Sequence, residues 1–184
     1  TFTETGDQIY PNDGTQKKGQ LNDGSGTTPT LMDDRFVIIA DNDSLQINVN
    51  IYSQKDGHLV GRHSVFAKDS SACENSIVAY KNSLFIGNTS NYTDPFDIND
   101  TPGGIDRFDF NQQTGKFEKA ENWPAEHIDG KTATPKMSTA TGVIYVYNRQ
   151  EESDDGHNDW QLTAIDYETG RKVFSIRPEF DKGQ

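Results

Sequence analysis

The sequence predicts an all-β protein, and three observations support this. The seven Tyr, ten Phe and two Trp residues lie in short runs with β-branched neighbours, whereas disordered chains contain few residues of either kind. The 16 Gly residues, with many Asn, Asp, Ser and Thr, supply turns between these runs. No window has the apolar spacing of a long amphipathic helix. A chain of 184 residues is long enough to bury a sizeable core.

A strand followed by a tight turn that ends in glycine occurs three times. The three segments are residues 51–57, 108–115 and 164–170. Each is followed by a second short strand, at residues 58–66, 116–123 and 171–177. Apolar runs joined by short turns that contain glycine are typical of β-hairpins. The chain is therefore expected to contain three hairpins at nearly equal spacing.

Two further strand-like runs precede each hairpin. They are residues 28–32 and 36–40, 76–80 and 83–87, and 135–138 and 143–148. The repeating unit is thus four short antiparallel strands in about 55 residues. A β-sandwich also uses many short strands, but the periodic D/N-x-x-T-G turn favours a β-propeller, in which each four-stranded unit is one blade.

The repeat divides the chain into blades. We expect the first blade at residues 25–66, the second at 67–123 and the third at 124–178, followed by a short tail at 179–184. Residues 1–24 form an N-terminal segment that is a candidate for part of a neighbouring blade. Propellers typically have four to eight blades, so three do not close a ring. The remaining blades are expected in the same protein or in another chain.

Charge and cysteine content exclude several classes of function. The net charge of -12 would repel a phosphate backbone, so nucleic acid is not an expected partner. No apolar stretch approaches the roughly 20 residues that a membrane-spanning helix needs. Cys73 is the single cysteine, which excludes an internal disulfide and a multi-thiolate zinc site. We expect its thiol to be a small buried packing group.

A further set of strings occurs at residues 24–32 with 40–42, 72–76, 133–138 and 162–170. These strings resemble the quinoprotein-like propellers of the pyrroloquinoline-quinone repeat superfamily, close to a group of exported bacterial propeller proteins of unassigned activity. The resemblance covers about residues 8–178. The resemblance implies a propeller fold and an extracellular or periplasmic location. Quinone dehydrogenases of the superfamily carry adjacent cysteines and tryptophan-rich docking motifs. This chain has one cysteine and only Trp123 and Trp160, so pyrroloquinoline quinone is not the expected cofactor.

Polar residues gather where the loops of one propeller face are expected. That face carries the connections between blades and those between the second and third strands of each blade, where binding sites are commonly built. Asp41, Glu74, Asn75 and Asn88 lie in these connections. Carboxylate and amide oxygens are the ligands that calcium selects, so these four residues are a candidate calcium site. The alternative is that they satisfy strand ends and turns, as Asn and Asp commonly do.

Candidate catalytic residues are few. Lys136 or Arg149 could stabilise negative charge beside such an ion, and His157 is the candidate acid or base. The loops at 88–104 and 149–158 are long and acidic but lack the ligand spacing of an EF-hand. They are interpreted as solvated acidic loops. No nucleophile elbow and no phosphate-binding glycine loop occurs in the sequence.

Three functions are consistent with these features. The leading hypothesis is an exported propeller module without catalytic activity, which binds a ligand or partner through its loop-rich face. An alternative is a calcium-assisted enzyme, either a quinoprotein-like oxidoreductase or a lactone or ester hydrolase, with its site at the channel mouth. A third is a structural subunit that assembles through open blade edges. The sequence leaves open whether the protein is an enzyme.

Overall fold

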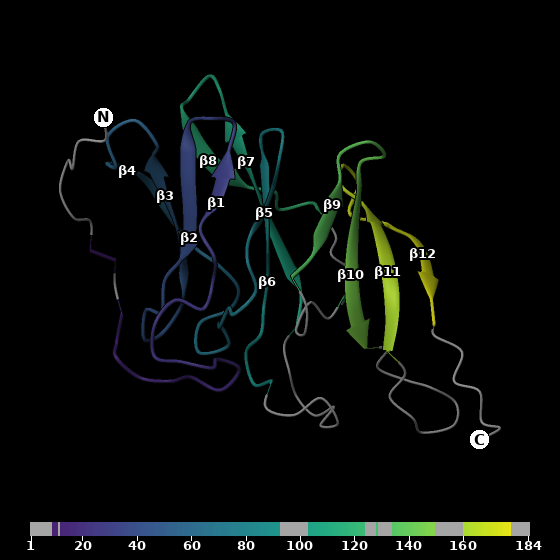
Figure 1. Ribbon diagram of the computed structural model, residues 1–184, viewed down its shortest axis with the longest axis horizontal. Coiled ribbons are helices and arrows are strands. Elements are labelled where there is room, and N and C mark those ends of the chain that lie inside the picture. The colour runs from purple at the N-terminus through teal and green to yellow at the C-terminus, as the bar shows by residue number, and fades with distance from the viewer. Residues whose placement is uncertain are drawn as a thin grey trace.

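The structure is a computed structural model that describes residues 9–10, 12–92, 103–123, 128, 134–149 and 160–177. This part of the chain contains strands and turns but no helix (Figure 1). It forms three four-stranded sheets, and every neighbouring pair of strands is antiparallel. The expectation of an all-β chain with three four-stranded units is therefore confirmed.

Each sheet is formed by four strands that are consecutive in the sequence. The first sheet contains β1 (Thr30–Met32), β2 (Phe36–Ala40), β3 (Asn48–Ser53) and β4 (Leu59–Ser64). The second contains β5 (Val78–Tyr80), β6 (Ser83–Gly87), β7 (Ile105–Asn111) and β8 (Lys116–Lys119). The third contains β9 (Lys136–Ser138), β10 (Val143–Arg149), β11 (Trp160–Asp166) and β12 (Lys172–Ile176).

Strand boundaries agree with the expected ones to within a few residues. The largest differences are at β11, which begins at Trp160 and not at the expected Ala164, and at β8, which was expected to continue to Trp123 but ends at Lys119. The chain turns there, because the Trp123 amide donates a hydrogen bond to the carbonyl of Ala120 at 3.0 Å. This turn carries the Trp123 ring back towards Phe85 in β6, with ring centroids 5.4 Å apart.

The turns that close the three hairpins share one geometry. Gly57, Gly115 and Gly170 all have positive φ, at 72°, 67° and 70°. In the third turn, the carboxylate of Asp166 accepts hydrogen bonds from the amide of Thr169 at 2.8 Å and from its hydroxyl at 2.7 Å. These hydrogen bonds lower the pKa of Asp166. In this motif the glycine thus adopts the positive φ, and the acidic or amide residue accepts hydrogen bonds within the turn.

Replacing Gly115 with Val is expected to destabilise the protein by roughly 1–2 kcal/mol, the cost of the left-handed conformation for a residue with a β-carbon. A β-carbon at this position would meet no atom within 4 Å, so the cost is conformational rather than steric. Urea unfolding monitored by fluorescence measures it. Gln113→Val, at an exposed position of the same turn, is the matched control. Equal losses in the two variants would contradict this account of the turn.

The second sheet is covered on both faces, and β6 shows why. Leu84 and Ile86 point to one side and join the core shared with the first sheet. Phe85 points to the other side and joins the core shared with the third sheet. All five residues of β6 are buried, as expected for a strand whose two faces are both packed. The three sheets therefore lie in the order first, second, third, with an apolar core in each gap.

The first strands of the three sheets lie next to one another. β1 contacts β5, and β5 contacts β9 (Figure 1). On the outer side of the first gap, β4 contacts β8. An aromatic cluster fills this gap, where the Phe36 ring lies 5.0 Å from that of Phe110 and 5.5 Å from that of Phe117. In the described part of the chain the sheets form an open series and do not close on themselves.

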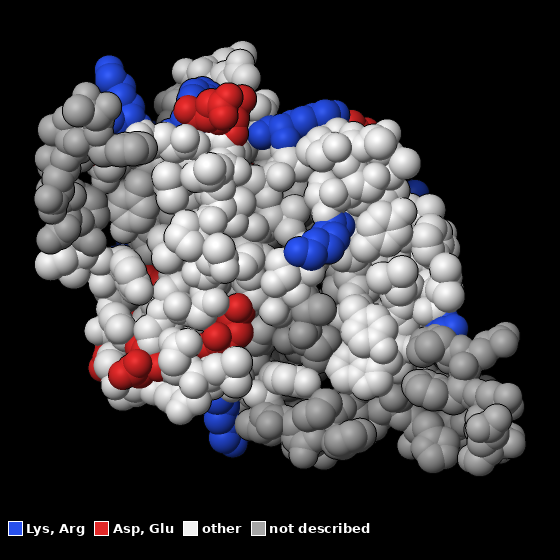
Figure 2. All heavy atoms as spheres, in the orientation of Figure 1, with Lys and Arg blue, Asp and Glu red and all other residues white. Residues whose placement is uncertain are grey.

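The outer face of the third sheet is apolar and exposed. The exposed fractions are 41% for Tyr147, 37% for Leu162, 40% for Phe174 and 56% for Ile176. Trp160 stacks on Tyr147, with centroids 5.2 Å apart and 9° between the ring planes. Figure 2 shows that the surface over β10 and β11 carries few charged side chains. The two faces of the second sheet, by contrast, are each buried by a neighbouring sheet.

Candidate functional site

The N-terminal segment lies across the loop ends of the first two sheets. Residues 16–21 contact the loop that precedes β5, at 72–75, and the loop that follows β6, at 88–92. The Thr89 hydroxyl donates a hydrogen bond to the Gly19 carbonyl at 2.7 Å. These are the connections in which the sequence predicted a binding site, but the N-terminal segment itself was not part of that prediction.

Two further hydrogen bonds fasten the segment on either side of Gly19 and Gln20. The amide of Asn91 donates to the carbonyl of Lys18 at 3.0 Å. The amide of Leu21 donates to Oε1 of Glu74 at 2.8 Å. The loops of the second sheet therefore hold the segment through one backbone amide, one hydroxyl and one carboxylate.

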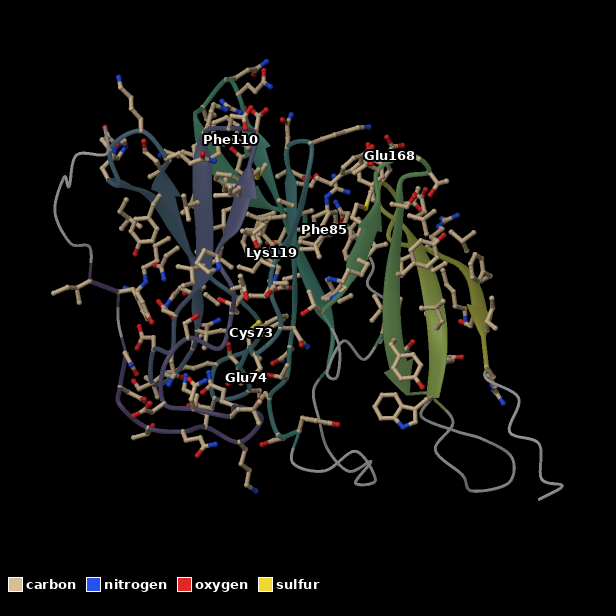
Figure 3. All side chains as sticks on the ribbon, viewed as in Figure 1. Cys73, Glu74, Phe85, Phe110, Lys119 and Glu168 are labelled. Atoms are coloured by element: carbon tan, nitrogen blue, oxygen red, sulfur yellow. The ribbon has the colours of Figure 1, made fainter. Side chains whose placement is uncertain are left out.

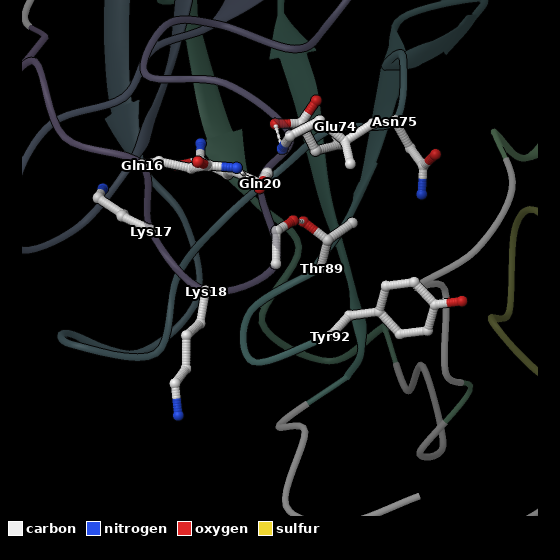
Figure 4. A pocket seen from close by; sticks show the side chains of 10 residues that line it. Gln16, Lys17, Lys18, Gln20, Glu74, Asn75, Thr89 and Tyr92 are labelled. Carbon is white, nitrogen blue, oxygen red and sulfur yellow. Dashed lines mark hydrogen bonds between the residues drawn. The ribbon is translucent and has the colours of Figure 1, made fainter. Parts of the chain in front are cut away.

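A pocket of about 530 Å³ lies between the segment and the two loops (Figure 4). This volume is within the roughly 300–1,000 Å³ that small-molecule sites occupy. Most of its lining side chains are polar. The lining residues are Gln16, Lys17, Lys18, Gly19, Gln20, Leu21, Glu74, Asn75, Thr89 and Tyr92.

Gly19 allows the segment to approach the second loop closely. Its φ is +94°, and a β-carbon built on it would lie 1.8 Å from the carbonyl oxygen of Thr89. No L side chain fits at that distance, and a positive φ adds strain for any residue with a β-carbon. The close contact between the N-terminal segment and Thr89 in the pocket wall therefore requires glycine at position 19.

Gln20 is the most unusual residue of the pocket. It is 5% exposed, yet neither Nε2 nor Oε1 has a hydrogen-bond partner in the described part of the chain. Gln16 donates to the backbone carbonyl of Gln20 at 2.8 Å, which positions the backbone but leaves the side-chain amide unpaired. A buried polar group without a partner costs roughly 1–3 kcal/mol. Native proteins keep few such groups, and each calls for an explanation.

Among the described lining residues, Glu74 supplies the only carboxylate. Its Oε1 accepts the hydrogen bond from Leu21, and no described residue donates to its Oε2. A β-carbon at Gly26 would lie 1.8 Å from Oε2, so Gly26 leaves room for the carboxylate. Glu74 lies in the loop region below the strands, as Figure 3 shows.

The two lysines of the lining are oriented away from a ligand position. The ammonium of Lys17 donates to the carbonyl of Asp43. Burial lowers the pKa of Lys17, and the nearby carboxylates of Asp13, Asp41 and Asp43 partly offset this effect. Lys18 extends away from the other lining side chains in Figure 4.

Asp41, one of the four predicted calcium ligands, lies outside the pocket lining. It is 1% exposed. Its carboxylate accepts hydrogen bonds from the Asn48 amide at 2.7 Å and from Nδ2 of Asn50 at 3.1 Å. Arg62 forms an ion pair with it at 3.3 Å. The protein itself therefore supplies partners to both oxygens of Asp41.

Asn88 is buried and lies outside the pocket lining, and its side chain pairs with backbone groups. Its Oδ1 accepts from the amide of Ser90 at 3.0 Å, and its Nδ2 donates to the carbonyl of Ser70 at 2.8 Å. Glu74 and Asn75 both line the pocket. The structure thus brings two of the four predicted ligands together. No group of three or more His, Cys, Asp or Glu suited to a metal occurs among the described residues, and the calcium site stays a prediction.

The three candidate catalytic residues are not brought to the pocket by the described structure. Lys136 is the first residue of β9 and is exposed. Arg149 ends β10, and its side chain lies outside the described residues, as does all of His157. The greater part of the two long acidic loops, at 93–102 and 150–159, also lies outside them.

Cys73 is buried beside the pocket, as expected (Figure 3). Burial raises the pKa of its thiol to about 12. We expect no reaction with Ellman's reagent at pH 8 in the native protein and complete reaction in denaturant. Because the unfolded thiol ionises above about pH 9 while the folded thiol keeps its proton, this group also lowers stability as the pH rises from about 9 to about 12. Rapid labelling of the folded chain would contradict the buried assignment.

Comparison with known proteins gives one relative at low identity. A protein of Archaeoglobus fulgidus described as uncharacterized is 26% identical over 203 aligned residues, which cover 89% of this chain. The chain spans 37% of the length of that relative. No protein-family model matches the chain. In the described part of the structure no helix is long and apolar enough to cross a membrane.

Proposed function

We propose that the three sheets are consecutive blades of a β-propeller and that this module binds a small ligand at its loop end. The order of the sheets, with β1, β5 and β9 next to one another and an apolar core in each gap, supports the propeller. The resemblance to exported propeller proteins supports an extracellular or periplasmic location. The ligand-binding role rests on the pocket between residues 16–21 and the loops of the second sheet.

The observation that carries the binding role is the unpaired amide of Gln20. Burial of this unpaired amide is unfavourable, and it occurs where the N-terminal segment packs against two loops. A packing role would be served as well by an apolar side chain of the same length. A role for the Gln20 amide in binding a ligand would explain both why the side chain is buried and why the protein supplies no partner for it in the described part of the chain.

A small-molecule screen by ligand-observed NMR tests the binding role. We expect some members of a library of small polar molecules to bind the native protein and to lose binding in Gln20→Met, which keeps the side-chain length and removes the amide. Gln113→Met, at an exposed turn position, is the control and should bind as the native protein does. Binding that is equal in both variants would exclude the pocket, and a library without any binder would overturn the proposal.

A second candidate role is assembly through the outer face of the third sheet. Leu162 and Ile176 are exposed there, on a face whose counterparts in the second sheet are covered by another sheet. We propose that a further four-stranded sheet packs on this face, as the sheets of this chain pack on one another. In a propeller, that sheet would be the next blade.

Mass in solution tests this second role. The native chain is expected to associate as its concentration rises, and the double variant Leu162→Lys/Ile176→Lys to remain monomeric, in sedimentation or light-scattering measurements. Leu45→Lys, at an exposed position in the first sheet's loop, is the control and should associate normally. A native chain that stays monomeric at every concentration would contradict the proposal.

A further inference from the structure

We infer that the pocket takes an uncharged polyhydroxyl molecule, a polyol or sugar, which pairs with the amide of Gln20 and the carboxylate of Glu74. This inference rests on the proposed binding function and names its ligand class. It depends on the hydrogen-bonding groups of the pocket that have no described protein partner, and on the orientation of its two lysines away from a ligand.

Gln20 demands both kinds of hydrogen-bonding partner from a ligand. Its Nε2 offers two donors and its Oε1 one acceptor with two lone pairs, and neither atom has a partner among the described residues. Both atoms are buried within the pocket wall, so the Gln20 side chain must turn towards the pocket to meet a ligand. A hydroxyl group both donates and accepts, so two neighbouring hydroxyls then match the two ends of one amide. A ligand with acceptors alone would leave Oε1 unpaired.

Glu74 adds a second acceptor at the pocket wall. Its Oε1 is occupied by the Leu21 amide at 2.8 Å, which leaves Oε2 to accept a hydrogen bond from a ligand. An anionic ligand would be repelled by this carboxylate, whereas a hydroxyl would donate to it. Hydrogen bonds of this kind, with one charged partner, are stronger than those between neutral groups.

The cations of the lining do not favour a charged ligand. Lys17 donates to the Asp43 carbonyl, and Lys18 extends away from the pocket (Figure 4). Among the described lining residues, an anion therefore meets no cation that points at it and meets one carboxylate that repels it. The buried unpaired group is a neutral amide, so a neutral ligand is the best match.

Tyr92 gives the pocket an aromatic surface. Its ring lies beside Thr89 at the edge of the pocket in Figure 4. The face of an aromatic ring carries partial negative charge, which suits the C–H groups on the flat side of a sugar or cyclic polyol. The polar groups of the lining and this aromatic ring together match a molecule that carries hydroxyl groups along its edge and C–H groups on its face.

The test is a titration of the isotope-labelled chain followed through the side-chain amide resonances of Gln20. The probes are D-glucose and myo-inositol, with inorganic phosphate, ethylamine, acetamide and calcium chloride for comparison. We expect glucose or inositol to shift the Gln20 resonances saturably and the other probes to leave them unchanged. Glu74→Gln keeps the Leu21 hydrogen bond and should weaken polyol binding several-fold. Gln20→Met, read through the Leu21 amide, should weaken it by about tenfold or more.

The outcomes distinguish a failure of the proposed ligand class from a failure of the proposed binding function. Stronger shifts with phosphate, ethylamine, acetamide or calcium than with either polyol would overturn the ligand class and leave the binding function in place. Gln20 resonances that no probe and no member of the screening library moves would show that water alone pairs with the amide, and both proposals would fail. If Gln20→Met does not fold, the native titration and Glu74→Gln decide the result.

Discussion

Replacing Phe85 with Ala should lower the free energy of unfolding by about 3–5 kcal/mol. Phe85 is fully buried and lies in the gap between the second and third sheets (Figure 3). It packs in one cluster with Ile144, Val146 and Ile165 from the third sheet. Removing the ring would leave a cavity between two sheets, which can collapse only if the sheets move together.

Urea unfolding, followed by the fluorescence of the two tryptophans, measures this loss. Leu31→Ala is the control, because Leu31 is 68% exposed and its truncation should cost less than about 0.5 kcal/mol. A loss below about 1 kcal/mol for Phe85→Ala would contradict the packing of the third sheet on the second. That packing is also the basis for the proposed propeller, so the result bears on both.

Replacing Asp41 with Ala should destabilise the protein by roughly 3 kcal/mol. The buried side chains of Asn48 and Asn50 both donate to this carboxylate, and both would lose this acceptor. Nδ2 of Asn48 would keep only the carbonyl of Gln46, at 3.3 Å. Arg62 would lose one of its two anionic partners. The cost is large because the two amides cannot turn to water without disrupting β3.

Asp43→Ala is the matched control for this second prediction. Asp43 also pairs with Arg62, at 2.6 Å, but its side chain is 39% exposed, and exposed pairs contribute at most about 1 kcal/mol. Both variants are measured by urea unfolding with calcium and with a chelator. A loss that appears only when calcium is present would identify Asp41 as a calcium ligand instead of the acceptor of an internal network.

Much of the fold could be predicted because its signals are local. The turn at Gly115 was recognised from a short motif, since the positive φ of its last residue is a property of that residue and its neighbours. The strands followed from short apolar and β-branched runs bounded by turn residues. The end of β8 was missed by a few residues, because the turn before Trp123 carries no glycine or proline signal.

The candidate site could be predicted only in part. Glu74 and Asn75 were identified because they lie in a loop between two repeats, and such loops meet at one end of the fold. Gln20 was missed, since nothing near it in the sequence distinguishes it from other polar residues of the N-terminal segment. Its significance comes from Thr89 and Glu74, which are far along the chain.

Features that the sequence predicts and features that only the structure shows differ in the distance along the chain over which they are determined. Dihedral preferences and the distribution of apolar residues act over a few residues, so the turns, the strands and their grouping into three repeats can be recognised in the sequence. Burial and hydrogen-bond pairing depend on segments that meet only after folding. The folded chain shows that Asp41 and Asn88 pair with the protein, while Gln20 is buried beside a pocket without a partner in the described part of the chain.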